Sequence, residues 1–242
     1  DTYHIPVMLN ETLSLLDVQR GGVYFDCTLG GGGHSEAILR AGGAVVAVDR
    51  DPEAVEWSKN RLSSYGSVFS ARVARFSSIR DVAGGMAGRF EGVIMDLGIS
   101  SRMIDDPAKG FSYRHDGPLS MDMGGAGSSA RDLVNGLSRA ELVSIFRTWG
   151  EEHHAARIAD AIIRCRSRRP VETTGELSRI VEDAVGGSMP QKSKARIFQA
   201  LRIAVNDEIG ELRAGLDGAL AILKPGGRLL VEIGPTQGVA VS

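Results

Sequence analysis

The chain has 242 residues, 43% hydrophobic and 24% charged, a composition typical of a soluble globular protein with room for one α/β domain and an inserted subdomain. The net charge of −2 gives no global sign of nucleic-acid binding, and the two distant cysteines argue against a disulfide framework or a zinc site and for a reducing compartment. The longest apolar runs are strand-sized, so no transmembrane helix is predicted, and residues 1–11 lack the regions of a signal peptide.

The first hundred residues alternate short apolar runs with helical stretches, the pattern of a parallel sheet with crossover helices. Strands are predicted, in chain order, at 23–29, 44–48, 67–73 and 91–97. Helices are predicted at 35–40 and 52–62. Pro52 is compatible with the second helix, because proline is tolerated in a first helical turn. This half of the chain therefore predicts an α/β fold.

The pattern changes after the fourth predicted strand. Residues 100–127 are rich in Gly, Pro, Asp and Ser, and a loop of this length is uncommon unless it is functional or disordered. From 130 to 185 apolar residues recur at three- and four-residue spacing, which predicts an inserted helical subdomain. A long helix at 195–223, a turn, and a fifth strand at 228–233 follow.

Only nine residues follow the fifth predicted strand. An open sheet that ended on this apolar strand would leave an edge in need of cover, either from a partner or from more chain. We expect the second, namely that the natural protein continues and this chain is cut short.

A glycine-rich turn, Gly30–Gly33, separates the first strand from its helix. Glycines there permit positive φ and a close approach of backbone to ligand, and Asp49, nineteen residues after Gly30, suits ribose hydroxyls. The turn lacks the last glycine of the dinucleotide motif, and Asp26 suits a sulfonium and an ammonium better than a pyrophosphate. These features predict S-adenosylmethionine rather than NAD; a tight turn that binds nothing is the alternative.

A second candidate site lies at the carboxyl end of the fourth strand, in the string Asp96-Leu-Gly-Ile-Ser-Ser101. Ligands of open α/β sheets bind at the carboxyl ends of the strands. A carboxylate at that place can accept a hydrogen bond from an amino nucleophile and orient its lone pair towards a methyl group. Asp96 is therefore the predicted catalytic residue, and a loop-capping aspartate is the alternative.

Several strings together resemble the bacterial RsmH (MraW) family, which methylates the N4 amino group of a cytidine in small-subunit (16S) ribosomal RNA. The similarity runs from about residue 4 to residue 230, and the DLGISS and FQALRI strings in this order are far more specific than a glycine turn. The matching strings are HIPVM at 4–8, DCTLGGGGHS at 26–35, AVDRDP at 47–52, MDLGISS at 95–101, KGFSY at 109–113, DGPL at 116–119, GEE at 150–152, FQALRI at 198–203 and VNDE at 205–208.

The resemblance implies a class I (Rossmann-like) methyltransferase domain at 1–104 and 196–242, with a loop and helical insertion for the RNA substrate at 105–195. It implies a cytoplasmic enzyme that uses S-adenosyl-L-methionine, has the small ribosomal subunit RNA as its partner and does not associate with a membrane; a homodimer is left open. The implied contacts to the methyl donor are Gly32, Gly33, His34, Asp49, Phe76 and Asp96, together with Gly30 of the same turn.

The chain departs from the family pattern in three places. Met103 stands where the family usually has a Gln, which puts one donor contact in doubt, and the string at 118–123 lacks an Arg and shifts an acid. The string VEIGPTQ at 231–237 replaces a segment containing F-H-S-L-E-D. We therefore expect the carboxyl-terminal strands of the domain to be missing or altered.

Recognition of the RNA is predicted from the insertion. A target base within folded RNA must be splayed out and held by stacking, which Phe111 and Tyr113 in the long loop would supply unless they merely pack the loop. The arginines of the insertion form either a solvated helix face or a patch that grips the RNA backbone. The predicted patch consists of Arg164, Arg166, Arg168 and Arg169.

Two other functions stay open at this point. The chain is alternatively a methyltransferase for a protein or small molecule, with the insertion as a substrate lid. It is alternatively a catalytically inactive RNA-binding or assembly factor, to which the departures give some weight. Salt-insensitive activity on small substrates would indicate the first, and donor binding without turnover on any RNA would indicate the second.

Overall fold

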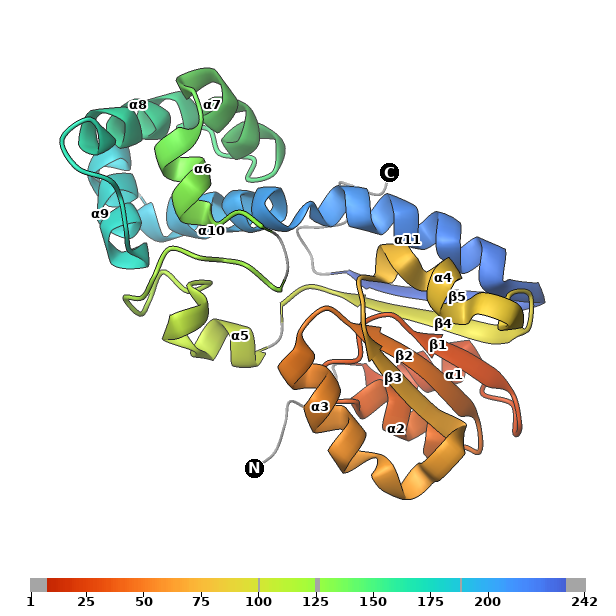
Figure 1. The fold of residues 1–242 in the computed structure, drawn as a ribbon. Helices are drawn as coiled ribbons and strands as arrows, with labels where there is room; N and C mark the ends of the chain where they lie inside the picture. Colours follow the sequence, from red (N-terminus) through yellow and green to blue (C-terminus); the bar gives the residue numbers. More distant parts are fainter. Residues whose placement is uncertain (1–7, 100, 125–126, 188, 234–242) are drawn as a thin grey trace. The chain divides into compact units, whose positions relative to one another are not determined.

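The computed structural model describes residues 8–99, 101–124, 127–187 and 189–233 of the chain. The predictions made for 4–7 and 234–237 lie outside these residues. The chain divides into two compact units, one made of 1–100 and 209–242 and the other of 101–208 (Figure 1). Within the described residues, no helix has both the length and the apolar character needed to cross a membrane.

The first unit is built on a five-stranded parallel sheet with the strand order β3-β2-β1-β4-β5. This confirms the predicted α/β class. The strands are β1 (Val23–Asp26), β2 (Ala44–Asp49), β3 (Phe69–Val73), β4 (Phe90–Leu97) and β5 (Leu223–Ile233). The central strand β1 and its neighbour β4 are mostly buried, as expected for strands covered on both faces.

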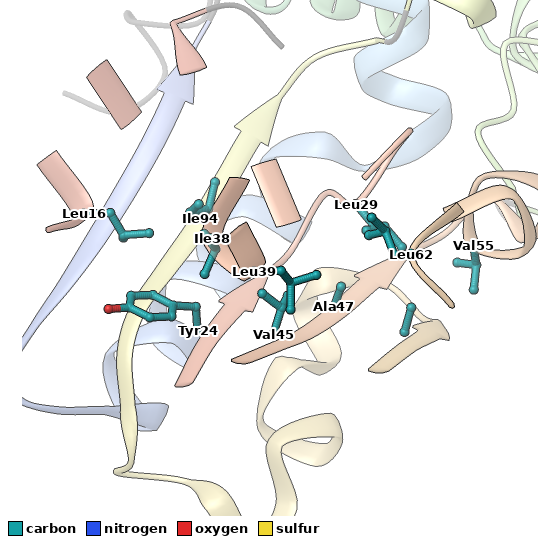
Figure 2. Packing of buried hydrophobic residues seen from close by; sticks show 11 residues of the cluster. Leu16, Tyr24, Leu29, Ile38, Leu39, Val45, Ala47, Val55, Leu62 and Ile94 are labelled. Atoms are coloured by element: carbon teal, nitrogen blue, oxygen red, sulfur yellow. The ribbon is translucent and has the colours of Figure 1, made fainter. Parts of the chain in front are cut away.

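Helices cover both faces of this sheet (Figure 1). Buried side chains of α1, α2 and α3 form one cluster with Tyr24, Val45 and Ile94 (Figure 2). Side chains of α4 and α11 form a second cluster with Phe25 and Met95 on the opposite face. These helices are α1 (Leu9–Leu16), α2 (Gly33–Arg40), α3 (Pro52–Arg61), α4 (Ile79–Ala83) and α11 (Glu208–Ile222), with short 3-10 turns at Ser63–Val68, Phe76–Ser78 and Gly84–Met86.

The second unit is helical, as the periodicity of its apolar residues predicted. Its core gathers Phe146, Ile158, Val181 and Leu201, which are all buried. Three of its helices begin at a Ser or Thr that caps the first turn together with an acid three residues later. The helices are α5 (Ser101–Asp105), α6 (Ala130–Gly136), α7 (Arg139–Thr148), α8 (Ala155–Arg166), α9 (Thr174–Val185) and α10 (Pro190–Asn206), with a 3-10 turn at Pro107–Lys109.

The long helix predicted at 195–223 is wrong. It is two helices, α10 and α11, because Asp207 between them has a left-handed conformation, with φ 47°. The side chain of Asn206 stabilises the break: its amide accepts a hydrogen bond from the Met123 N–H at 3.0 Å and donates to the Met121 carbonyl at 2.8 Å. No Gly or Pro marks the position, and the apolar periodicity continues across it, so the sequence pattern predicts one helix.

Other differences from the predicted elements are smaller. The predicted loop at 100–127 contains α5 and a 3-10 turn, and helices α1 and α4 were not predicted. Strand β5 begins at Leu223 rather than 228, because Leu223 already pairs with Phe90 before the register shifts at residue 92. The predicted turn lies inside this shift, where Gly226 has φ 79°.

The boundaries of the compact units differ from the predicted domain limits. The second unit ends at 208 rather than 195, because α10 packs with α6, α7 and α9. The division of the chain into a donor-binding part at 1–104 and 196–242 and an RNA-binding part at 105–195 stays a prediction.

Candidate active site

Four strands of the sheet carry an acid on the same face, at their last residue or the one before it. Side chains alternate along a strand, so Asp26 lies on the face of Tyr24, and Asp96 on the face of Ile94. By the same alternation, Asp49 lies on the face of Val45, which is the face covered by α1–α3. The fourth acid, Glu232, stands two residues after Leu230, which packs against the same cluster. The carboxyl edge of the sheet is therefore acidic.

The glycine turn connects β1 to α2 above this edge. Gly30 has φ 48° and Gly32 has φ 76°, a left-handed region that favours glycine. Gly32 is also the residue before the first turn of α2, and a Cβ atom there would lie 3.1 Å from both Leu62 and Ser58 of the neighbouring helix segment. The predicted need for glycine at 32 thus has two physical causes, conformation and space.

Asp49 fastens the turn. Its carboxylate accepts hydrogen bonds from the N–H of Gly30 at 2.8 Å and from the N–H of Asp51 at 2.9 Å. Burial raises the pKa of Asp49, and these two hydrogen bonds oppose the rise. A carboxylate has about four lone-pair sites, so the half-buried group keeps acceptor capacity for ligand hydroxyls.

Asp26 lies beneath the turn and is 1% exposed. One oxygen accepts the hydroxyl of Ser35 at 2.6 Å and the other the N–H of Thr28 at 3.1 Å. Burial raises the pKa of Asp26, with the Ser35 hydrogen bond opposing the rise. Because Asp26 is enclosed, it contributes to the edge through its charge and through Ser35 and Thr28, which it holds in place.

His34 belongs to the first turn of α2 and is 6% exposed. Its Nε2 atom is buried and has no hydrogen-bond partner among the described residues. An unsatisfied buried polar atom costs about 1–3 kcal/mol, so a ligand that hydrogen-bonds to Nε2 would remove a penalty as well as gain a contact. This orphaned nitrogen is the strongest local indication that the edge binds a ligand.

Asp96 is the last residue but one of β4 and is half-buried. Its backbone N–H donates to the Thr28 hydroxyl at 2.7 Å, so the ends of β1 and β4 are joined at the site. The strand order places Asp26 between Asp49 and Asp96, since β1 lies between β2 and β4. The structure therefore brings together the glycine turn, His34 and the acids that the sequence predicted.

Phe76 follows β3 in a short 3-10 turn and is half-buried. Its ring packs against α11 so closely that a Cβ atom on Gly215 would lie 2.5 Å from Phe76 Cδ2. Glycine at 215 thus leaves room for the ring. Phe76 belongs to the first unit, together with the other donor-binding residues predicted there.

The remaining predicted residues lie in the second unit. Met103 is half-buried in α5, and Phe111 is 6% exposed. The ring of Tyr113 meets that of Phe198 edge-on, with centroids 5.6 Å apart. Both aromatic side chains therefore pack within the loop and α10, and Tyr113 keeps the more accessible ring.

The arginines at the end of α8 have different environments. Arg164 and Arg168 are exposed. Arg166 is half-buried and donates to the Val134 carbonyl at 2.7 Å, while Arg169 pairs with Glu176 at 2.7 Å. Arg164 and Arg168 are consequently the better placed of the four to meet a phosphate.

Several residues of the site were missed from the sequence. Ser58 donates to the Gly30 carbonyl at 2.8 Å, and Arg61 donates to the Gly31 carbonyl. Thr28 joins β1 to β4, and Glu232 lies opposite Asp96 on β5. Only the pairing of distant segments reveals these roles.

The edge suits a ligand with hydroxyls and positive charge. Several buried or half-buried acids would repel a pyrophosphate, which disfavours NAD. The glycine turn and the first turn of α2 offer backbone N–H groups to the polar atoms of a ligand. Among the described residues there is no cluster of three His, Cys, Asp or Glu side chains that fits a metal ion. The arrangement can bind a ribose-bearing cation and place a second reactant near Asp96.

Comparison with known proteins identifies relatives over nearly the whole chain. The MraW methylase family matches residues 1–233. The protein "Ribosomal RNA small subunit methyltransferase H" of Symbiobacterium thermophilum is 44% identical over 237 residues, covering 95% of this chain and 74% of the relative. Its namesake in Caulobacter vibrioides is 47% identical over 230 residues, covering 94% and 72%.

A third relative of the same name, in Carboxydothermus hydrogenoformans, is 45% identical over 233 residues, covering 94% of this chain and 75% of the relative. Among solved structures, an S-adenosylmethionine-dependent O-methyltransferase of Thermotoga maritima overlaps 40% of this chain and 37% of its own, with 19% identity and a TM-score of 0.33. That overlap is too small to bear on function.

Proposed function

The chain belongs to the MraW methylase family, and we propose that it methylates the N4 amino group of a cytidine in small-subunit (16S) ribosomal RNA with S-adenosylmethionine as the donor. The observation that carries the proposal is the acidic carboxyl edge, where the glycine turn fastened by Asp49 stands beside Asp96.

The residues at this edge fit the donor. The carboxylate of Asp49 would accept the ribose hydroxyls, the backbone at Gly30, Gly32 and Gly33 would line the donor, and the orphaned Nε2 of His34 would gain a partner. Phe76 supplies an apolar wall at the end of β3. When bound, S-adenosylmethionine supplies an electrophilic methyl group on a positively charged sulfur.

Asp96 would orient the nucleophile. The amino group of cytosine is a poor nucleophile because its lone pair is delocalised into the ring, so rate depends on positioning and on an acceptor for its hydrogens. The Asp96 carboxylate would accept one of those hydrogens and direct the lone pair towards the methyl group. The hydrogen bond from its backbone to Thr28 holds the residue at the end of the strand.

The second unit would hold the RNA. Tyr113 and Phe111 are proposed to stack on the extruded base, and the half-buried ring of Tyr113 is the better placed for it. The exposed Arg164 and Arg168 would contact phosphates, with lesser contributions from Arg166 and Arg169, which already have protein partners. Met103 is proposed to contact the donor by hydrophobic packing.

The cellular setting follows from the substrate. A ribosomal RNA substrate supports a cytoplasmic location and a partnership with the small ribosomal subunit. A homodimer is proposed as the oligomeric state, because β5 is an edge strand of the described sheet and can pair with a second copy of the chain.

The direct test is methyl transfer from labelled S-adenosylmethionine to small ribosomal subunits that lack the modification, followed by digestion and identification of the nucleosides by mass. We expect N4-methylcytidine with the wild-type chain and at least a hundredfold less with Asp96→Asn, at unchanged donor affinity. Methylation of another nucleoside, or undiminished activity of the variant, would contradict the proposal.

A second experiment separates the alternatives. The double variant Arg164→Ala/Arg168→Ala should weaken RNA binding and reduce the salt slope by about two, because each phosphate contact contributes about one. Activity on a protein or small molecule would be insensitive to salt. Donor binding without transfer to any RNA would indicate an inactive binding factor.

A further inference from the structure

Glu232 lies beside the proposed catalytic residue. Its Cα is the register partner of the Asp96 Cα in the parallel pairing of β4 with β5. Adjacent strands lie about 4.8 Å apart, and register partners project their side chains from the same face of the sheet. The two carboxylates are therefore neighbours at the carboxyl edge.

The face they share is that of α1–α3. Ile94 and Leu230, each two residues before one of the acids, are also register partners. Ile94 belongs to the buried cluster of that face (Figure 2). Leu230 packs against this cluster. The alternation of side chains then places both acids above the cluster, on the side where the first turn of α2 carries His34.

Charged groups face Glu232 from two neighbouring elements. The carboxylate of Asp96 on β4 and the imidazole of His34 on α2 both act on the charge of Glu232. Asp26 on β1 lies one strand beyond Asp96. From α1, Asp17 pairs with Arg228 near the other end of the strand. Burial raises the pKa of the half-buried Glu232, Asp96 raises it further, and His34 opposes the rise.

We propose that Asp96 and Glu232 act as a carboxylate pair, in which Asp96 accepts the hydrogen bond of the attacking amino group and Glu232 takes up the proton that this group loses. The inference rests on the proposed function. It assigns a role to a residue that stands outside the predicted donor and RNA contacts.

The chemistry balances within the proposed reaction. The amino nitrogen bonds to the methyl carbon, the carbon–sulfur bond of the donor breaks, and its electron pair stays on sulfur. The nitrogen then carries a positive charge and gives one proton to the Glu232 carboxylate, which becomes a carboxylic acid and later releases the proton to water. Asp96 keeps its hydrogen bond to the amino group, and Glu232 takes the proton because burial and the neighbouring Asp96 carboxylate raise its pKa.

The pair itself can be tested without turnover. Carbon-13 NMR of labelled glutamate side chains, with the Glu232 signal assigned by its loss in Glu232→Gln, would follow the titration of this carboxyl group. We expect it to titrate above the ordinary range of glutamate in the wild type, and at lower pH in Asp96→Asn. A titration that is the same in both proteins would overturn the pairing.

The role in transfer is tested by the pH dependence of kcat. We expect Glu232→Gln to lower kcat by about tenfold to a hundredfold and to remove the acidic limb of its profile, with donor affinity within twofold of the wild type. Glu232→Asp keeps a carboxylate and should recover part of the rate. Glu56→Gln, on the exposed face of α3, is the matched control and should not change it.

The outcomes are distinguishable. A wild-type rate of Glu232→Gln at every pH would overturn the role, and so would a loss of donor affinity or thermal stability that accounts for the whole loss of rate. If the wild-type chain transfers no methyl group to RNA, the proposed function fails, while the titration of Glu232 still decides whether the pair exists.

Discussion

The carboxylate of Asp49 should stabilise the glycine turn through a charged hydrogen bond that Asn cannot replace. In the structure both Asp49 oxygens accept a backbone N–H, from Gly30 at 2.8 Å and from Asp51 at 2.9 Å. The amide of Asn has only one acceptor atom, so in Asp49→Asn one N–H would face an NH₂ group. Losing a hydrogen bond to a charged group costs about 1.5–3 kcal/mol.

We expect the lower end of that range. Burial raises the pKa of Asp49, which means that the folded protein already carries a cost for its charge, and the neutral amide removes that cost. A local loss of about 1.5 kcal/mol corresponds to roughly tenfold faster hydrogen exchange of the Gly30 amide, if it exchanges by local opening. Loss of the ribose acceptor should weaken donor binding by about tenfold or more.

The assay is amide hydrogen exchange by NMR, with donor affinity measured by calorimetry. The matched control is Asp51→Asn, two residues away. Asp51 caps α3 by accepting the Glu53 N–H at 2.9 Å, and Asn caps helices as well as Asp does, so the change should stay below about 1 kcal/mol. Equal exchange of the Gly30 amide in Asp49→Asn and the wild type would refute the reasoning.

Two further predictions concern backbone conformation and pH. Gly32→Ala should lower the free energy of unfolding by about 1–2 kcal/mol, because Gly32 has a φ of 76°. The control Gly85→Ala should leave this free energy unchanged, because Gly85 has open space around it and no positive φ. Equal urea midpoints for the two variants would contradict the prediction. Asp116 accepts hydrogen bonds from the Thr173 side chain and from the Gly175 N–H, and these hold the pKa of its carboxyl group below the ordinary 3.8. Because the pKa of Asp116 is lowered in the folded protein, the stabilisation that its carboxylate gives is present above pH 3.8 and is lost as the pH falls through the folded pKa. Exchange of the Gly175 amide should therefore rise in that pH range in the wild type. The variant Asp116→Asn should show no such step.

The sequence by itself determined the features that depend on neighbouring residues. Short apolar runs bounded by glycine located the first four strands to within a few residues, since strand periodicity and turn chemistry are local. The turn at Gly30–Gly33 and the acids Asp49 and Asp96 were predicted because each stands at the carboxyl end of a strand, and parallel strands bring these ends to one edge.

Other features needed the tertiary structure. The break at Asp207 depends on Asn206 binding a loop more than eighty residues earlier, so helical periodicity does not reveal it. The enclosure of Phe111 likewise depends on how the loop packs in the helical unit.

Glu232 illustrates the division most clearly. In the sequence it is one acid in an apolar strand, and its meaning depends on which strand pairs with β5 and in which register. Register sets both the neighbour of a side chain and the face from which it projects, and a shift by one residue would move Glu232 to the face of α4 and α11. Sequence periodicity identifies a strand, but only the hydrogen-bonded pairing of distant segments decides which carboxylates meet.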